Sequence, residues 1–352
     1  MRHRPQPTHS LNPARRGACA WLAWGLLAWP TARAEDGNTM AVQARALERA
    51  QQAVLGVQVM AVEDARSART LGRDRSGSGV LIDADGLVLT IGYLVLEAEQ
   101  VLLTRDDGRP VPARVIGYDL ATGFGLLQAL APLGLQPAPL GRADRVDDRA
   151  PLMIASGGDD GAVSVAQLVA RRPFSGDWEY HIDGALFTAP PRRDHSGAGL
   201  FNAAGELVGI GSLLVADAVG DAAGGGTRRS GNMFVPVDLL TPILAELRRD
   251  GIGPASRRAW LGLNCAEVDG QLRVVRVTDD SPADVAGLEA GDRILRIDGT
   301  EVKSLGALWQ ALWAGGAPER AVQLLIERGD AQQALTVHSV DRMKTLRRSQ
   351  GI

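Results

Sequence analysis

Ser196 has the surroundings of a catalytic nucleophile, because it stands in a short segment of small residues, Asp194-His195-Ser196-Gly197-Ala198-Gly199-Leu200. A serine hydroxyl attacks a substrate only when a general base lies within hydrogen-bond reach, and the base needs an acid that holds its tautomer. After the first 34 residues the chain contains three histidines, namely His181, His195 and His338. The segment therefore predicts a nucleophile whose base has to come from this small set.

None of these histidines stands in an obvious position for a base. His195 adjoins Ser196 in sequence, but adjacent side chains in a tight turn rarely reach a common proton, and His181 is expected to be a half-buried histidine on a strand. Asp119 and Asp183 would supply the acid only if a base existed. A triad relocated to other residues remains the alternative, because sequence does not show geometry. Scattered histidines also lack the spacing of metal ligands, so we expect neither a metal nor a cofactor.

The start of the chain reads as a targeting signal. Arg15-Arg16 precede an apolar run from Ala18 to Pro30, and Ala32-Arg33-Ala34 gives the small-residue pattern of a cleavage site. We expect residues 1–34 to be a signal peptide cleaved after Ala34, which places the mature protein in the periplasm. An uncleaved membrane anchor is the alternative, although the apolar run is short for a membrane span.

The charge balance argues against a nucleic-acid partner. The formal net charge of the 352 residues is −3, and residues 1–34 contribute five arginines and no acid. The remaining 33 basic residues face 41 acidic residues, a balance of −8, and no basic patch that would bind nucleic acid remains. Removal of the leader also removes Cys19, so Cys265 is left without a partner for an internal disulfide.

Short apolar runs separated by turn signals predict a mainly β architecture over about 57–237. Asp85-Gly86, Asp107-Gly108 and the turn at 203–205 each separate two apolar runs, which is typical of β-hairpins. Many short strands at this spacing favour a sandwich or a barrel. The glycine-rich stretch 220–231 is expected to be a loop.

Helical spacing flanks this region over 39–54 and over 237–249, and Gly251 is expected to end the second helix. A polar linker, 250–258, then leads to a compact α+β unit. That unit contains a turn at Asp269-Gly270, several short strands and a helix over 305–313. The chain ends in a basic tail, 342–352, which is expected to be frayed.

The order of these segments resembles the HtrA/DegP family of exported serine proteases. The run 77–90 is similar to the family's opening hairpin, and Asn232-Met233-Phe234-Val235-Pro236 is similar to the strand that closes its second barrel. The resemblance implies a mostly β fold, with an N-terminal helix segment over 35–56 and a chymotrypsin-like double antiparallel β-barrel over 57–249. A C-terminal α+β PDZ domain over 259–341 is then expected to follow.

Two of the three catalytic residues that this resemblance implies are replaced. The family's histidine follows the opening hairpin, where this chain has Tyr93. The family's aspartate stands in a Thr-Asp-Leu-Ala-Val-Leu pattern, where this chain has Gly123 after Thr122. A phenol with a reference pKa near 10 is a poor proton acceptor at neutral pH, and glycine has no side chain at all. Of the triad Ser196 alone remains, as a vestigial nucleophile.

The oxyanion loop departs from the family pattern as well. Asp194 takes the place of the glycine whose backbone N–H faces the developing negative charge, and Ala198-Gly199 replace Gly-Pro. We expect the Cβ of Asp194 to conflict with an unusual backbone angle, and its carboxylate to repel the charge that forms.

The PDZ-like part retains its binding loop. Trp260-Leu261-Gly262-Leu263 resembles the loop whose successive backbone N–H groups capture the C-terminal carboxylate of a peptide. The run Ser281-Pro282-Ala283 through Asp292 matches the same kind of domain. On the helix that follows, most of the apolar stripe is expected to be core, while Leu308 and Leu312 are expected to face the peptide.

These observations predict an exported HtrA-like protein with a degenerate triad, which binds peptides or unfolded chains through its PDZ domain as an adaptor, chaperone or regulator of envelope protein quality control. The alternative is an active serine endopeptidase of the HtrA type that uses Ser196. A structural subunit that co-assembles with an active homologue is not separable from the first hypothesis by sequence. The resemblance further implies peptide C-termini or unfolded proteins as partners, and a homo-oligomer, as a trimer.

Overall fold

A computed structural model describes residues 34–148, 150–158, 161–220 and 227–347. The expected signal peptide therefore lies outside the described residues, apart from Ala34. The chain divides into a first unit, Met1–Val42, and a second unit, Gln43–Ile352. Helix α1 (Ala34–Gln52) starts in the first unit and ends in the second, two residues before the end predicted from its spacing. No helix among the described residues is long and apolar enough to cross a membrane.

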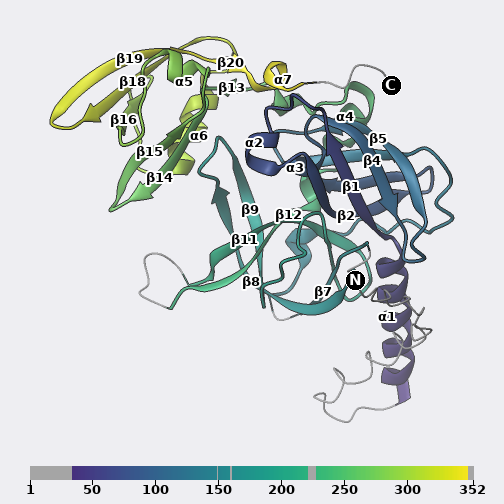
Figure 1. The fold of residues 1–352 in the computed structure, drawn as a ribbon. Coiled ribbons are helices and arrows are strands. Elements are labelled where there is room, and N and C mark those ends of the chain that lie inside the picture. The colour runs from purple at the N-terminus through teal and green to yellow at the C-terminus, as the bar shows by residue number, and fades with distance from the viewer. Residues whose placement is uncertain (1–33, 149, 159–160, 221–226, 348–352) are drawn as a thin grey trace, which may run out of the picture. The chain divides into compact units, whose positions relative to one another are not determined.

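Six antiparallel strands close the first barrel (Figure 1). Its strands are β1 (Val54–Ala61), β2 (Asp74–Asp83), β3 (Leu87–Ile91), β4 (Ala98–Thr104), β5 (Pro110–Tyr118) and β6 (Phe124–Ala129). They pair in the order β1-β2-β3-β6-β5-β4. The hairpins predicted at Asp85-Gly86 and Asp107-Gly108 are confirmed as β2–β3 and β4–β5. Two short helices, α2 (Ala68–Leu71) and α3 (Gly92–Val95), belong to the same part of the chain.

A second closed barrel follows. Its strands are β7 (Pro151–Ala155), β8 (Val163–Ser175), β9 (His181–Ala189), β10 (Gly199–Phe201), β11 (Leu207–Val219) and β12 (Arg229–Pro236). They pair in the order β10-β11-β12-β9-β8-β7. The hairpin predicted at 203–205 is confirmed as β10–β11. Of the expected loop 220–231, residues 221–226 lie outside the described residues, and its last part belongs to β12.

Apolar side chains fill both barrels because alternate residues of each strand point inward. Fully buried aromatic rings stand at the centre, namely Phe124, Phe187, Phe201 and Phe234. The expectation of a mostly β fold with two antiparallel barrels is thus confirmed.

The helix predicted over 237–249 is wrong as a continuous element. The chain instead forms a 3-10 turn, η3 (Val237–Leu239), and a separate short helix, α4 (Leu244–Asp250). Pro242 lies between them, and its ring removes a backbone donor and obstructs the preceding turn of a helix. The predicted stop at Gly251 is confirmed, since this residue adopts φ +75° and its N–H donates to the Leu247 carbonyl at 3.0 Å.

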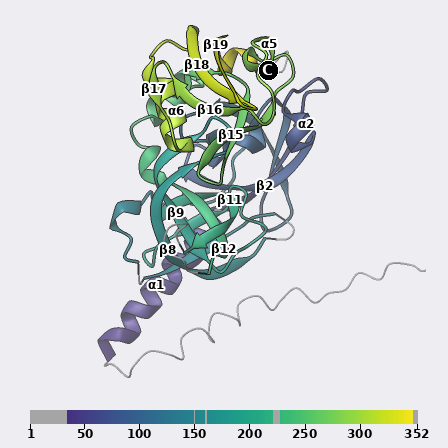
Figure 2. The same ribbon diagram turned by 90° about the vertical axis from the view of Figure 1, so that its left-hand side faces the viewer.

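The C-terminal domain is a sheet with helices beside it, and Figure 2 shows α6 alongside its strands. The strands are β14 (Leu263–Val268), β15 (Gln271–Val277), β16 (Arg293–Ile297), β17 (Thr300–Glu301), β18 (Ala321–Arg328) and β19 (Ala331–His338). A separate pair, β13 (Ala259–Trp260) and β20 (Val340–Asp341), joins the two ends of the domain. The helices are α5 (Pro282–Val285) and α6 (Leu305–Ala314). The predicted turn at Asp269-Gly270 and the predicted helix over 305–313 are confirmed.

The tail was expected to be frayed after Arg342, and for its first residues this is wrong. Arg342–Thr345 forms helix α7, in which Asp341 caps the N–H of Met343 at 3.0 Å. The Arg342 guanidinium lies 4.2 Å from the centre of the Trp260 ring. Further on, the N–H of Arg347 donates to Glu97 in the first barrel at 2.8 Å. These contacts hold the start of the tail in place.

Candidate functional site

Ser196 meets Tyr93 between the two barrels. Tyr93 belongs to α3, directly after β3 of the first barrel, and Ser196 lies in the loop that leads into β10 of the second. The phenol oxygen of Tyr93 is 2.8 Å from Ser196 Oγ and 2.8 Å from the backbone carbonyl oxygen of Ser212. The sequence comparison had placed Tyr93 at the position of the base, and the structure brings this side chain into contact with the serine hydroxyl.

The direction of these hydrogen bonds follows from proton counting. A phenol carries one proton, and a carbonyl oxygen only accepts, so the phenol donates to Ser212 and Ser196 donates to the phenol oxygen. Burial raises the pKa of Tyr93 to about 12, although the hydrogen bond with Ser196 works against the shift. At neutral pH Tyr93 is therefore a neutral hydrogen-bond partner of Ser196.

Gly123 lies beside the start of helix α3, which carries Tyr93. Its carbonyl oxygen accepts from the N–H of Gly92 at 2.6 Å, one residue before Tyr93. Gly123 has φ +82°, a conformation that side chains rarely adopt. A Cβ at this position would lie 3.2 Å from the Tyr180 hydroxyl. The backbone at the predicted aspartate position is thus shaped for glycine.

Asp194 turns its carboxylate into a polar cluster. Arg192 Nε donates to Asp194 Oδ1 at 2.9 Å, and Arg192 and Ser156 both make short contacts with Oδ2. Burial disfavours the ionised carboxylate, but the hydrogen bonds from Arg192 and Ser156 outweigh it and lower the pKa of Asp194 to about 2. The negative charge expected to repel an oxyanion is therefore paired with Arg192. Asp194 is also absent from the residues with positive φ in the described part of the chain, so the expected backbone conflict is not found.

The backbone of the serine loop is hydrogen-bonded to both barrels. The N–H of Ser78 in β2 donates to the Ser196 carbonyl at 2.8 Å, and the N–H of Gly197 donates to Gly211 at 2.8 Å. Gly197 has φ +74°, and a Cβ there would lie 1.9 Å from the Ser78 carbonyl oxygen. Glycine is therefore required next to the serine by the packing of the two barrels.

The histidines are engaged elsewhere. His195 Nδ1 lies 3.1 Å from the Arg192 carbonyl oxygen, and burial lowers the pKa of this imidazole. His181 is half-buried at the start of β9, as expected, with Nδ1 2.8 Å from Ser175 Oγ. His338 is exposed at the end of β19. Asp119, considered as an acid, accepts from Thr122 and from Ser256 in the linker. In the part of the chain that the structure describes, no histidine ring is hydrogen-bonded to Ser196 Oγ.

The loop at the start of the C-terminal domain holds a carboxylate from its own chain. The backbone N–H groups of Leu261, Gly262 and Leu263 donate to Oε1 of Glu179 at 2.9, 2.9 and 3.2 Å. Gly262 adopts φ +90°, which directs these groups to a common point, and a Cβ there would lie 2.2 Å from Ser281 Cβ. The three N–H groups that the sequence singled out thus converge on one anion.

The other residues predicted to bind a peptide pack against the rest of the protein. Leu308 and Leu312 lie fully in the domain core, and Trp260 packs under Arg342. The helix residue that reaches the groove is Trp309, whose indole N–H donates to the Gly176 carbonyl at 3.0 Å. Trp309 belongs to the apolar stripe of this helix, but the sequence favoured Leu308 and Leu312, and it did not indicate Glu179 at all. No local signal marks Glu179, because its partners lie more than 80 residues away in sequence.

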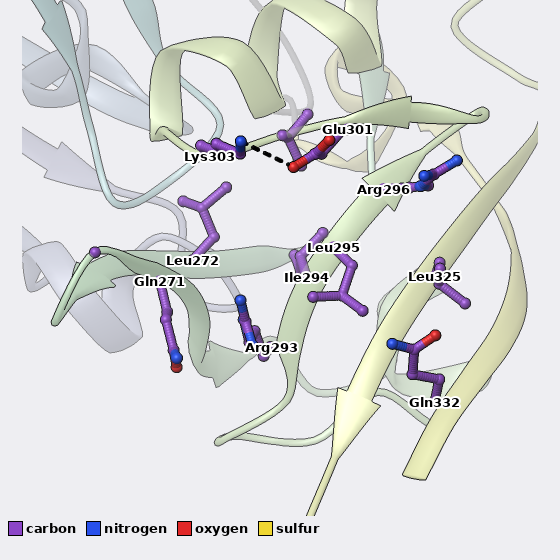
Figure 3. A pocket seen from close by; sticks show the side chains of 12 residues that line it. Gln271, Leu272, Arg293, Ile294, Leu295, Arg296, Glu301, Lys303, Leu325 and Gln332 are labelled. Carbon is purple, nitrogen blue, oxygen red and sulfur yellow. Dashed lines mark ion pairs between the residues drawn. The ribbon is translucent and has the colours of Figure 1, made fainter. Parts of the chain in front are cut away.

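A separate cavity of about 390 Å³ lies on the sheet of this domain (Figure 3). Its lining includes Arg293, Arg296 and Gln332, and an ion pair of 3.0 Å joins Lys303 and Glu301. None of the residues that contact Ser196 or Glu179 takes part in this lining.

Comparison with known families gives two matches along the chain. Residues 77–210 match the trypsin-like peptidase domain, and residues 259–338 match the PDZ domain. The first range contains Tyr93, Gly123 and Ser196, and the second contains the loop that binds Glu179.

Several known proteins are similar to the chain over most of its length. HhoA of Synechocystis sp., which carries a serine protease name, is 30% identical over 285 residues, covering 75% of this chain and 70% of that protein. The serine endoprotease DegS of Haemophilus influenzae is 28% identical, covering 72% and 73%. A DegP-like relative of Halomonas elongata, named as a periplasmic serine endoprotease, is 28% identical, and the match spans 55% of its length.

A solved structure of the HtrA-type protease AlgW with a tripeptide shares the fold, with a TM-score of 0.51 and 23% identity, over 88% of this chain and 98% of that one. The order of two closed barrels and a PDZ domain, together with the similarity to HhoA, shows that this chain belongs to the HtrA/DegP family of trypsin-like serine proteases with a PDZ domain.

Proposed function

We propose that this protein is a catalytically inactive member of its family, a pseudoprotease that binds peptide C-termini or unfolded chains. The observation that carries the proposal is the contact of 2.8 Å between the Tyr93 phenol and Ser196 Oγ. Because its pKa is about 12, the Tyr93 phenol is already protonated at neutral pH and does not take the proton of Ser196. Loss of the base costs about a million-fold in turnover in enzymes of this kind.

The binding part of the proposal rests on the PDZ domain. Its loop presents three convergent N–H groups, which is the arrangement that captures a terminal carboxylate. An adaptor, chaperone or regulator of envelope protein quality control needs this kind of recognition and no hydrolysis. The periplasmic name of a DegP-like relative supports export of this protein. Cleavage after Ala34 is part of the same proposal and rests on the small-residue pattern at residues 32–34. A homotrimer or a complex with an active homologue is the expected assembly.

Hydrolysis of casein by the mature protein, with Ser196→Ala as the matched control, tests the proposal. We expect the two proteins to give the same background turnover. We also expect no covalent labelling of Ser196 by a fluorophosphonate that labels an active relative. Turnover that disappears in Ser196→Ala would establish instead the active endopeptidase considered as the alternative.

A further inference from the structure

The segment Gly176–Glu179, between β8 and β9, occupies the PDZ groove of the same chain. Glu179 is only 8% exposed, and its Oε1 accepts all three N–H groups of the loop 261–263. In a peptide complex of a PDZ domain, that position belongs to the terminal carboxylate of the ligand. The Glu179 side chain stands in for this terminal group.

The backbone next to Glu179 continues the likeness to a bound peptide. The N–H of Cys265 in β14 donates to the Asp177 carbonyl at 2.7 Å. Trp178 and Asn264 form an antiparallel β-bridge, and Asn264 Nδ2 donates to Asp177 Oδ2 at 3.2 Å. The segment therefore adds to the edge of β14, which is how a PDZ ligand extends the sheet.

Helix α6 contacts the opposite side of the segment. Trp309 donates its indole N–H to the Gly176 carbonyl at 3.0 Å. Gln310 follows Trp309 directly, and its Nε2 lies 3.0 Å from His181 Nε2, at the start of β9. The segment thus lies between β14 and α6, in contact with both, and Gly176 is buried there.

Burial disfavours the ionised form of Glu179, and the loop offsets this cost only in part. Burial raises the pKa of Glu179, while the three N–H groups and the nearby Arg342 charge work against the shift. A buried carboxylate without such partners would be strongly destabilising. A free peptide terminus offers the same loop a carboxylate with equivalent hydrogen bonds, so the two ligands are mutually exclusive.

We propose that Gly176–Glu179 is an internal ligand of the PDZ groove, and that a partner chain with a free C-terminal carboxylate binds by displacing it. This inference rests on the proposed function, because it concerns how the peptide site becomes accessible. A peptide then competes with the internal ligand. The apparent affinity for the peptide equals the intrinsic affinity multiplied by the fraction of molecules whose groove is open.

Occupancy by the internal ligand is tested first, by hydrogen exchange in the full-length mature protein without peptide. In the wild type, we expect slow exchange of the Leu261, Gly262 and Leu263 amides. In Glu179→Ala we expect their exchange to accelerate at least about tenfold, since their acceptor is lost. Glu99→Ala, which removes an exposed acid from β4, is the matched control and should leave these amides unchanged. Unchanged exchange in Glu179→Ala overturns the inference.

Displacement is tested by titration with a peptide that has an apolar last residue and a free C-terminus. We expect Glu179→Ala to bind it at least about tenfold tighter than the wild type and the Glu99→Ala control. Glu179→Gln, which keeps an acceptor oxygen, should lie between them, and Trp309→Phe should give a smaller gain. The same peptide with a C-terminal amide should bind to none of them.

The two proposals fail in different ways. Equal peptide affinity for the wild type and Glu179→Ala would overturn the internal ligand and leave the peptide-binding function intact. If Glu179→Ala shows the faster exchange but binds no peptide, the displacement step is overturned together with the proposed binding function. Far-ultraviolet circular dichroism of every variant identifies a protein that has failed to fold. If Glu179→Ala does not fold, the peptide affinities of Glu179→Gln and Trp309→Phe test the internal ligand instead.

Discussion

In the family fold, the serine loop and the PDZ loop each place groups around a negative charge. The two loops differ in whether this chain has the expected groups. At the serine loop, Tyr93, Gly123 and Asp194 stand where side chains or backbone groups of an active site are expected. The Ser196 hydroxyl donates a hydrogen bond to the Tyr93 phenol oxygen and keeps its proton. At the PDZ loop all three N–H groups remain, and they hold the carboxylate of Glu179.

The difference follows from what each site is made of. A catalytic triad depends on particular side chains, and one substitution removes its base without affecting the barrels around it. A carboxylate-binding loop depends on backbone N–H groups, which any sequence supplies as long as Gly262 keeps its positive φ. A single side-chain substitution is therefore more damaging to a catalytic triad than to a carboxylate-binding loop.

The largest effect concerns reconstruction of the serine site. In Tyr93→His we expect casein turnover to stay about 10⁴-fold or more below that of an active relative, because no acid orients the new imidazole. The measurement is turnover with a Ser196→Ala version of each variant as the blank. Activity within tenfold of the active relative would show that the base alone was missing.

Addition of Gly123→Asp should not complete the triad. Residue 123 has φ +82°, and its Cβ would point at the Tyr180 hydroxyl, 3.2 Å away. We expect the double variant to be less stable than Tyr93→His and no more active. Recovery of turnover in the double variant would show that the backbone here adapts to a side chain.

A second prediction concerns the rigidity of the serine loop. In Gly197→Ala the new Cβ would lie 1.9 Å from the Ser78 carbonyl oxygen, at φ +74°. We expect the free energy of unfolding in urea to fall by about 3 kcal/mol, from the clash together with the strained backbone. Gly184→Ala is the matched control, because Gly184 has φ +68° but nothing within 4 Å of its Cβ, and it should cost about 1 kcal/mol. Equal losses would show that contact with the first barrel does not hold the loop.

A third prediction uses the tyrosines as probes of the buried serine site. The chain has three tyrosines, and burial raises the pKa of Tyr93 and of Tyr118 to about 12 and that of Tyr180 further. A raised pKa in the folded state gives stability that is present below the reference pKa of 10.0 and lost as pH rises through about 12. Phenolate absorbance of the native protein should therefore appear about two pH units later than in urea. Tyr93→Phe should remove one of the three titration steps in phenolate absorbance. If the native protein shows a step near pH 10 that Tyr93→Phe lacks, Tyr93 is exposed to solvent and the prediction is wrong.

Much of the fold was accessible from sequence because its signals are local. Asp85-Gly86 and Asp107-Gly108 predicted two hairpins of the first barrel, since a tight turn is specified by its own residues. The prediction of one helix over 237–249 was wrong because its apolar spacing continues past Pro242, whereas the proline interrupts the helix.

The sites were accessible only in part. The contact of Tyr93 with Ser196 spans 103 residues. The sequence assigned Tyr93 to the position of the base only through a family resemblance, which supplied the tertiary arrangement. No such guide existed for Glu179, whose role depends on how the β8–β9 connection packs against a domain 82 residues further along the chain. A glutamate in a turn between strands is ordinarily a solvated residue, and only the fold distinguishes this one.

The smallest effect concerns Asp194, which stands at the predicted oxyanion position but is held by Arg192 and Ser156. Its pKa is lowered to about 2, so its ionised form stabilises the fold above the reference value of 3.8, and this contribution is lost as pH falls through about 2. The side chain is 40% exposed, so solvent screening limits the effect, and we expect Asp194→Asn to lower the free energy of unfolding by about 1 kcal/mol at neutral pH. The difference from the wild type should shrink between about pH 4 and pH 2 in urea unfolding. Asp183→Asn removes an acid on β9 that is 85% exposed, and its pair with His181 at 3.3 Å is screened by solvent, so this control should show little difference at either pH. A difference that persists unchanged at pH 2 would mean that Asp194 stabilises the protein through packing. Its charge pairing with Arg192 would then make no contribution to the serine loop.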